Sequence, residues 1–327
     1  MKVYTKIQSF ALATAVAVGA IAAMPTEALA EFPEKPVTIM VGYSAGGGTD
    51  SYARGMASFA HETLGQPMII VNRPGAASMI AAKAVKDAPA DGYTLLVVNG
   101  GTFLAGAMLK GDDAPADPLR DMQPLGGIGQ FISGMLVAKN NGYNSPQDVI
   151  AAAKANPGSL RWAHPGRGSI NMLAGALFLI DNGITAKDVP FDSGPAARNA
   201  ALSGQVDYAF TSISNFAGFE DKGMALGVSH TERDPVFKDV PTFAELDLPA
   251  LGVTGPMVVW GSKDMPEEAV TKLVASIKEI AEGDGYQRVM KRAGAAGFYL
   301  SPEDILASME NMQTRFGPII KDIKAQQ

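Results

Sequence analysis

The sequence predicts an α/β fold in two lobes, each with a mostly parallel sheet flanked by helices. Short apolar segments alternate with amphipathic ones, which is the pattern of parallel strands connected by helices on both faces of a sheet. The alternation begins at Val37 and starts again near Met135. The 327 residues also exceed the usual size of a single domain.

The first thirty residues have the pattern of a secretory signal peptide. Lys2 and Lys6 form a basic start, residues 10–23 are apolar, and residues 28–30 (ALA) match an A-x-A cleavage site. A membrane anchor is the alternative, but the apolar stretch is shorter than the ~20 residues that a span requires. We therefore expect a periplasmic protein, cleaved after Ala30.

Composition excludes several classes of protein. Removing Lys2, Lys6 and Glu27 from 27 basic and 33 acidic residues leaves 25 and 32, a net charge of −7. An acidic chain without a basic patch argues against binding to nucleic acid. The chain has no cysteine, which excludes disulfides, thiol catalysis and thiolate metal sites.

The first lobe is predicted at residues 31–130, with residues 230–327 returning to it. Thr49 can cap a helix whose apolar positions run from Tyr52 to Leu64, and Gly65 can end that helix. The predicted elements are strands at 37–41, 68–71 and 93–98, and helices at 49–64 and 78–86.

The second lobe is predicted at residues 131–229, so that crossing segments near 131 and 230 join the lobes. Ser145 can cap a helix in which Pro146 suits the first turn and Asp148 lies three residues after the cap. Further elements of this lobe are strands at 135–137, 160–164, 189–191, 206–211 and 224–229 and a helix at 170–179. The C-terminal part, which returns to the first lobe, is predicted to hold helices at 266–282 and 302–323.

Four glycine-containing loops follow predicted strands and open helices: residues 43–50, 72–78, 99–102 and 164–169. Such loops gather at one edge of a parallel sheet, where ligands bind. Each helix that begins there presents free backbone N–H groups and the positive end of its dipole. The sequence therefore predicts an anion site that needs no net positive charge.

Three other kinds of site fit the sequence less well. Residues 46–51 (GGGTDS) approach a dinucleotide-binding G-x-G-x-x-G, but serine replaces the third glycine and Asn72 replaces the expected acid. A serine hydrolase lacks its G-x-S-x-G elbow. His61, His164 and His230 are expected to be surface or structural, with no evident acid partner for His164. No metal-ligand spacing is found, including calcium spacing in GDDAPAD.

Arg167 and Asp192 both fall in predicted strand-end loops of the second lobe. They could form an ordinary surface or interdomain ion pair, or they could contact a charged ligand directly. In the second case Arg167 would bind a carboxylate through two parallel hydrogen bonds. Both interpretations stay open.

Six segments occur in an order that resembles a known family: YSAGGGTDSYAR, VNRPGAAS, ADGYTLLV, KANPGSLRWA, GQVD and DVPTFAE. From about Phe32 to the C-terminus, the chain resembles the extracytoplasmic solute-binding subunit of tripartite tricarboxylate transporters, also called the Bug family. The resemblance implies a type II periplasmic binding protein whose two lobes are joined by a hinge and close on a small carboxylate, without catalysis.

The resemblance also implies the binding residues. In such proteins the first two loops hold one ligand carboxylate, largely through backbone N–H groups and ordered water, and the second lobe supplies specificity. Carried onto this sequence, the set is Tyr43, Ser44, Ala45, Thr49, Asp50, Gly75, Ala76, Ala77, Ser78, Gly101, Thr102, Arg167, Gly168, Ser169, Phe191 and Asp192. Asp50 is expected to order the first loop, and as a first-turn acid it also suits the helix dipole.

The second lobe departs from the family pattern. Asn171 lies near the position of a usual histidine, and Phe191-Asp192 replaces a tyrosine followed by a basic or small residue. An acid at 192 disfavours a second ligand carboxylate unless Arg167 offsets it, and favours an amino or hydroxyl group.

We therefore predict a monomeric periplasmic binding protein, without metal or cofactor, that delivers a small carboxylate to two membrane subunits of a secondary transporter. The alternatives are an exported α/β enzyme that acts on a small carboxylate and a sensory binding module that reports to a membrane receptor. Turnover of candidate ligands separates the enzyme from the other two.

Overall fold

Parallel strands connected by helices form the framework of the protein. The computed structural model describes residues 31–325, so the predicted signal peptide lies outside the described residues. Within them, nine strands form a sheet in the order β2-β1-β3-β9-β4-β7-β5-β6, with β8 paired to β4. The strands are β1 (Val37–Val41), β2 (Met68–Asn72), β3 (Thr94–Asn99), β4 (Met122–Ala138), β5 (Arg161–His164), β6 (Lys187–Pro190), β7 (Tyr208–Ser212), β8 (Gly223–Val228) and β9 (Thr254–Ser262).

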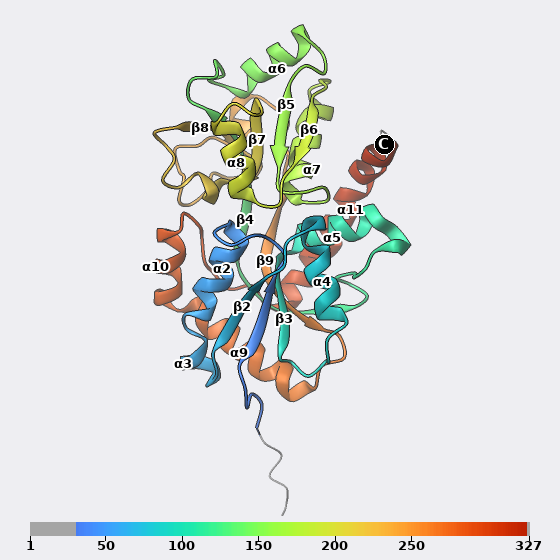
Figure 1. Ribbon diagram of the computed structural model, residues 1–327, viewed down its shortest axis with the longest axis vertical. Helices are drawn as coiled ribbons and strands as arrows, with labels where there is room; N and C mark the ends of the chain where they lie inside the picture. Colours follow the sequence, from blue (N-terminus) through green and yellow to red (C-terminus); the bar gives the residue numbers. More distant parts are fainter. Residues whose placement is uncertain (1–30, 326–327) are drawn as a thin grey trace, which may run out of the picture.

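The strands group into two lobes. The first lobe is built on β1–β3 and lies in the lower part of Figure 1, and the second lobe is built on β5–β8 and lies above it. In the first lobe β1 pairs in parallel with β2 and β3, and in the second lobe β5 pairs in parallel with β6 and β7. The two-lobed α/β fold is confirmed, whereas the boundaries near 131 and 230 stay a prediction.

Two long antiparallel strands, β4 and β9, run between the lobes (Figure 1). Their pairing shifts register on both sides of Gly126–Gly127, and Gly129 has a φ of 145°. Directly after this irregularity, Gln130 Nε2 donates to Thr254 Oγ1 at 3.1 Å and lies 3.0 Å from His230 Nε2. Side-chain contacts therefore hold three crossing segments together at the junction.

The segment after β8 stays in contact with the second lobe. The ring centroid of Phe243 lies 5.7 Å from that of Phe178 and 6.1 Å from that of Phe210. Gln147 also donates to the carbonyl of Leu246. These contacts extend the packing of the second lobe beyond residue 230.

Five helices begin and end near the predicted residues, whereas the helices at residues 194–202 and 284–292 were not predicted. The structure has α2 (Gly48–Ala57), α3 (Ala60–Leu64), α4 (Met79–Lys86), α5 (Gly100–Lys110), α6 (Pro146–Ala155), α7 (Ile170–Asp181), α8 (Gly194–Leu202), α9 (Glu267–Glu282), α10 (Asp284–Arg292) and α11 (Pro302–Ala325). The predicted capping box of α6 is present, because Ser145 and Asp148 each accept a hydrogen bond from the backbone of the other. No helix within residues 31–325 is long and apolar enough to cross a membrane.

The helix predicted at 49–64 is wrong in two respects. It is divided into α2 and α3 at Ser58–Phe59, and α2 begins after Gly47 rather than after a Thr49 cap. The hydroxyl of Ser58 donates to the carbonyl of Arg54, an interaction that competes with continuation of the helix. Gly65 ends α3 in the left-handed conformation, as predicted.

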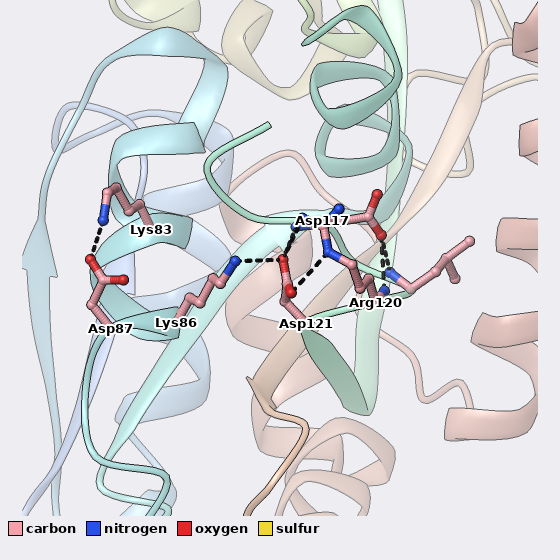
Figure 2. A network of polar contacts seen from close by, with 7 residues as sticks. Lys83, Lys86, Asp87, Asp117, Arg120 and Asp121 are labelled. Atoms are coloured by element: carbon pink, nitrogen blue, oxygen red, sulfur yellow. Dashed lines mark hydrogen bonds and ion pairs between the residues drawn. The ribbon is translucent and has the colours of Figure 1, made fainter. Parts of the chain in front are cut away.

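Ion pairs fix the end of α4 to the segment that precedes β4 (Figure 2). Asp121 accepts hydrogen bonds from Lys86 Nζ at 3.0 Å, from Arg120 Nη2 at 2.9 Å and from the backbone N–H of Asp117 at 2.9 Å. The Arg120 contact is the largest cause that lowers the pKa of Asp121 to about 2.

In residues 31–325, no group of three histidine or acidic side chains could hold a metal ion.

Candidate ligand-binding cleft

A small polar cavity lies between the two lobes. Its volume of about 20 Å³ has room for roughly one water molecule. The lining residues are Tyr43, Gly47, Gly48, Thr49, Asn99, Thr102, Phe131, Pro165, Asn171, Gly194, Thr211 and Asn215. None of these side chains is charged, so the cavity offers hydroxyl, amide and backbone groups.

Four helices begin at this cavity. Thr49, Thr102, Asn171 and Gly194 line it from the first turns of α2, α5, α7 and α8, two helices from each lobe. The N-terminus of α2 has no side-chain cap. Because helix N-termini carry partial positive charge and unpaired N–H groups, their convergence favours an anion in the cavity.

Side chains on α5 determine how the lobes meet at the cavity. Asn99 caps α5 by accepting a hydrogen bond from Thr102 N at 2.9 Å, and it donates to the carbonyl of Gly255 at 2.7 Å. The Thr102 hydroxyl accepts a hydrogen bond from Ile170 N at 3.1 Å. This bond joins the first turn of α5 in the first lobe to the first turn of α7 in the second lobe.

Asn171 presents an unsatisfied polar group to the cavity. Its side chain is 2% exposed, and its Oδ1 has no hydrogen-bond partner among residues 31–325. Leaving a buried acceptor unpaired costs ~1–3 kcal/mol, so the position is suited to a donor from a ligand or from water. Nearby, Asn215 donates to Thr211 Oγ1 at 2.8 Å. A Cβ at Gly194 would lie 2.1 Å from Asn215 Nδ2, so only glycine permits this pair.

Tyr43 lies where the small cavity meets a larger opening. Burial of its hydroxyl raises the pKa of Tyr43 to about 12, although the hydroxyls of Ser78 and Thr102 oppose the shift. Tyr43 therefore stays neutral and can donate a hydrogen bond. Ser78 Oγ is also buried; it lies close enough to influence the Tyr43 hydroxyl but forms no well-aligned hydrogen bond with any group in residues 31–325.

Asp50 shapes the first glycine loop but lines neither the cavity nor the opening. Its carboxylate accepts hydrogen bonds from Gly46 N and Arg54 Nε, both at 2.8 Å, and from Asn72 Nδ2 at 2.9 Å. Burial alone would raise the pKa of Asp50, but these hydrogen bonds lower it overall. Asn72 also donates to the carbonyl of Tyr43 at 2.9 Å, which connects the first loop to the end of β2.

The second loop has an unusual backbone. Gly75, Ala76, Ala77 and Ser78 have φ values of 126°, 48°, 51° and 74° in succession. A non-glycine residue in the left-handed region costs ~1–2 kcal/mol, and such strain clusters at functional sites. The loop faces the second lobe, because a Cβ at Gly166 would lie 3.5 Å from Ala77 N.

A larger opening of about 490 Å³ extends the small cavity, and the two share Tyr43 and Pro165. We call this opening the outer cleft. The predicted residues that line it are Tyr43, Gly75, Ala76, Ala77, Arg167, Gly168, Phe191 and Asp192. Together with Thr49 and Thr102 in the small cavity, most of the predicted set therefore lines these two adjacent spaces.

The remaining predicted residues, like Asp50, lie outside this lining. Ser44 is half-buried and Ala45 is exposed. Ser169 caps α7 by accepting from Met172 N at 3.1 Å. A Cβ at Gly101 would lie 2.8 Å from Ile170 Cδ1, so Gly101 allows the lobes to approach. Ser78 is buried beneath the second loop.

Arg167 forms an ion pair, but not with Asp192. Its Nη2 lies 2.9 Å from Asp188 Oδ2, and the same oxygen lies 3.2 Å from His164 Nε2. The contact with His164 is the largest cause of the lowered pKa of Asp188, and Arg167 adds to it against the effect of burial. His164 is fully buried and has an acid partner, which corrects the prediction that none exists.

Of the twelve residues that line the small cavity, the predicted set contains only Tyr43, Thr49 and Thr102. The nine that it missed include Phe131, Thr211 and Asn215, which lie outside the four predicted glycine loops. Thr211 lies at the end of β7, and Asn215 lies in the helical turn Ile213–Phe216 that follows it. The rule that ligands bind at the carboxyl ends of strands points to this segment, although it contains no glycine.

Comparisons with known proteins identify the family of this chain. Residues 52–325 match the family described as tripartite tricarboxylate transporter family receptor. The chain is 27% identical to BugT of Bordetella pertussis over 297 residues, which cover 90% of this chain and 91% of BugT.

Two solved structures are similar over most of their length. MatC from Rhodopseudomonas palustris with bound malate has a TM-score of 0.81 and 28% identity, and the similarity covers 88% of this chain and 100% of MatC. A second R. palustris protein, in a structure with adipate, has a TM-score of 0.83 and 26% identity over 89% of this chain and 98% of that protein. The family match covers most of the sequence, and the chain therefore belongs to the tripartite tricarboxylate transporter receptor family.

Proposed function

We propose that this protein is a periplasmic solute-binding protein that captures a small carboxylate between its lobes and delivers it to two membrane subunits of a tripartite tricarboxylate-type transporter. The observation that carries the proposal is the convergence of four helix N-termini, two from each lobe, on a small polar cavity. The carboxylates in the two similar structures support the same ligand class.

The proposed carboxylate site is in the small cavity. Thr49 and Thr102 lie on the side of the first lobe, and Asn171 and Thr211 lie on the side of the second lobe. Hydroxyl and amide donors bind a carboxylate without a counter-charge when helix N-termini point at it. Asp50 acts indirectly in this proposal, by holding the first loop in place through Gly46 and Asn72.

Entry of a ligand requires the lobes to move apart. The cavity holds about one water molecule, and the Ile170–Thr102 hydrogen bond closes it between the lobes. We therefore propose that β4 and β9 act as a hinge around the irregular pairing at Gly126–Gly127. When a ligand is bound, the two lobes close around it and the protein becomes more compact.

Thermal unfolding with a panel of carboxylates tests the proposal. A ligand at ~100 times its Kd stabilises the native state by about 2.7 kcal/mol, which for a chain of this length raises the Tm on the order of 5 °C. At least one small carboxylate should give this shift, and its amide should not. Equal shifts with the acid and the amide would show that the site does not bind a carboxylate.

Ala77→Asp places a negative charge in the wall of the outer cleft. Ala77 is buried and has a φ of 51°, a conformation that Asp tolerates better than most residues. The variant should unfold cooperatively and show no shift with the carboxylate. Ala151→Asp, on the exposed face of α6, is the matched control and should keep the shift. A folded Ala77→Asp protein that still binds would place the site elsewhere.

A further inference from the structure

One face of α5 runs from the small cavity to the mouth of the outer cleft. Thr102 lines the cavity, and Gly106, Leu109 and Lys110 line the outer cleft. These residues are spaced i, i+4, i+7 and i+8, which places them along a single face of a helix. Thr102 and Lys110 are therefore about 12 Å apart along the axis of α5.

The middle of this path is apolar. Leu109 and Met79 border it on the first lobe, and Met172 and Phe191 border it on the second lobe. The helix is closely packed at Gly106, because a Cβ there would lie 2.6 Å from Met79 Cε, and a Cβ at Gly168 of the second lobe would lie 3.2 Å from Gly106 Cα. A hydroxylated or highly charged ligand body would lose hydration here without gaining hydrogen bonds. The walls instead suit methylene groups or an aromatic ring.

Charged side chains gather only at the outer end of the path. Lys110, Arg167 and Asp192 line the outer cleft, which gives a net positive charge. Arg167 is paired with Asp188, whereas no acidic side chain in residues 31–325 forms an ion pair with Lys110. Lys110 comes from the lobe opposite Asp192. It supplies the cation that offsets Asp192, a role that the sequence suggested for Arg167.

We propose that the ligand is an elongated dicarboxylate with an apolar spacer, and that Lys110 determines specificity by binding its distal carboxylate. The inference rests on the proposed function, because the first carboxylate occupies the cavity at Thr102 and Asn171. The spacer lies between Leu109 and Met172, and the second carboxylate reaches Lys110 at the mouth. Short hydroxy acids such as malate fill only the inner end of this path.

Three probes of equal chain length separate the possible distal groups. Suberate ends in a carboxylate, octanoate ends in a methyl group, and ω-aminocaprylate ends in an ammonium group. Calorimetric titration should rank suberate first, octanoate second and ω-aminocaprylate last. Tightest binding of ω-aminocaprylate would show that Asp192 selects the ligand, and it would overturn the proposal.

Two substitutions at the mouth should act in opposite directions on suberate. Lys110→Met should weaken suberate binding by roughly two- to fivefold, the range for loss of an exposed ion pair, and should leave octanoate unchanged. Asp192→Asn should strengthen suberate binding by a similar factor. Lys83→Met, on the neighbouring helix α4 and outside the outer cleft, is the control and should change neither affinity.

The outcomes distinguish this inference from the proposed function. If malate or citrate binds and suberate does not, the elongated ligand is wrong while the carboxylate-binding function stands. If no carboxylate binds, the proposed function itself is wrong. Equal loss of suberate and octanoate in Lys110→Met would also overturn the inference, because the effect would not depend on the distal charge.

Discussion

Replacement of Asp50 by Asn tests whether its carboxylate orders the first loop. The carboxylate accepts three hydrogen bonds, from Gly46 N, Arg54 Nε and Asn72 Nδ2. An amide of the same shape has a single accepting oxygen, so its NH₂ group must face at least one of these donors. A hydrogen bond to a charged group contributes ~1.5–3 kcal/mol. We therefore expect a loss of about 2–3 kcal/mol in the free energy of unfolding, which lowers the Tm by roughly 4–6 °C.

The loss should depend on pH in a defined direction. The pKa of Asp50 is lowered in the folded protein, so its ionised form is the stabilising one. This stabilisation is present above the unfolded pKa of about 3.9 and disappears as the pH falls through the folded pKa. The difference between the wild type and Asp50→Asn should therefore be largest near neutral pH and should shrink in acid.

Urea unfolding at several pH values measures both effects. Asp87→Asn is the matched control, because Asp87 also pairs with a cation four residues away on a helix but is exposed (Figure 2). This control should change the stability by less than about 0.5 kcal/mol. Equal losses in the two variants would refute the idea that the buried hydrogen bonds, rather than the ion pair, make Asp50 important.

Two further substitutions test the closed form and the core. Thr102→Val removes the hydroxyl that accepts a hydrogen bond from Ile170 N, so a cost of ~1–3 kcal/mol falls on the closed form alone. The Kd of a bound carboxylate should therefore rise by roughly 5- to 100-fold. An unchanged Kd in calorimetry would contradict this. Gly175→Ala places a Cβ 2.2 Å from the buried ring of Trp162. Overpacking should cost ~1–3 kcal/mol, and the higher helix propensity of alanine should return ~1 kcal/mol. Denaturant unfolding should therefore show a net decrease in the free energy of unfolding. A net increase would show that the Trp162 ring moves easily.

The sequence predicts the parallel strands well and the buried central elements poorly. Strands β1 and β2 are short apolar runs between turn residues, and their predicted limits agree with the structure to within one residue. A helix was expected after residues 99–102, but its extent was not predicted, because α5 is apolar on all sides and buried, so no amphipathic period marks it. Strand β9 contains Gly255 and Pro256, which are typical of edges and turns, yet it lies between β3 and β4.

The candidate site shows a related limit of sequence reasoning. Its glycine loops are predictable because strand ends gather at one edge of a sheet, but this rule does not say which side chain of a loop faces the ligand. The charged side chains near these loops form ion pairs with one another: Asp50 pairs with Arg54, and Arg167 pairs with Asp188. Ser169 is occupied by capping α7, so the cavity is lined instead by Asn171, two residues later. Neutral amides and hydroxyls keep free hydrogen-bonding capacity because they lack such partners, and this leaves them available for a ligand.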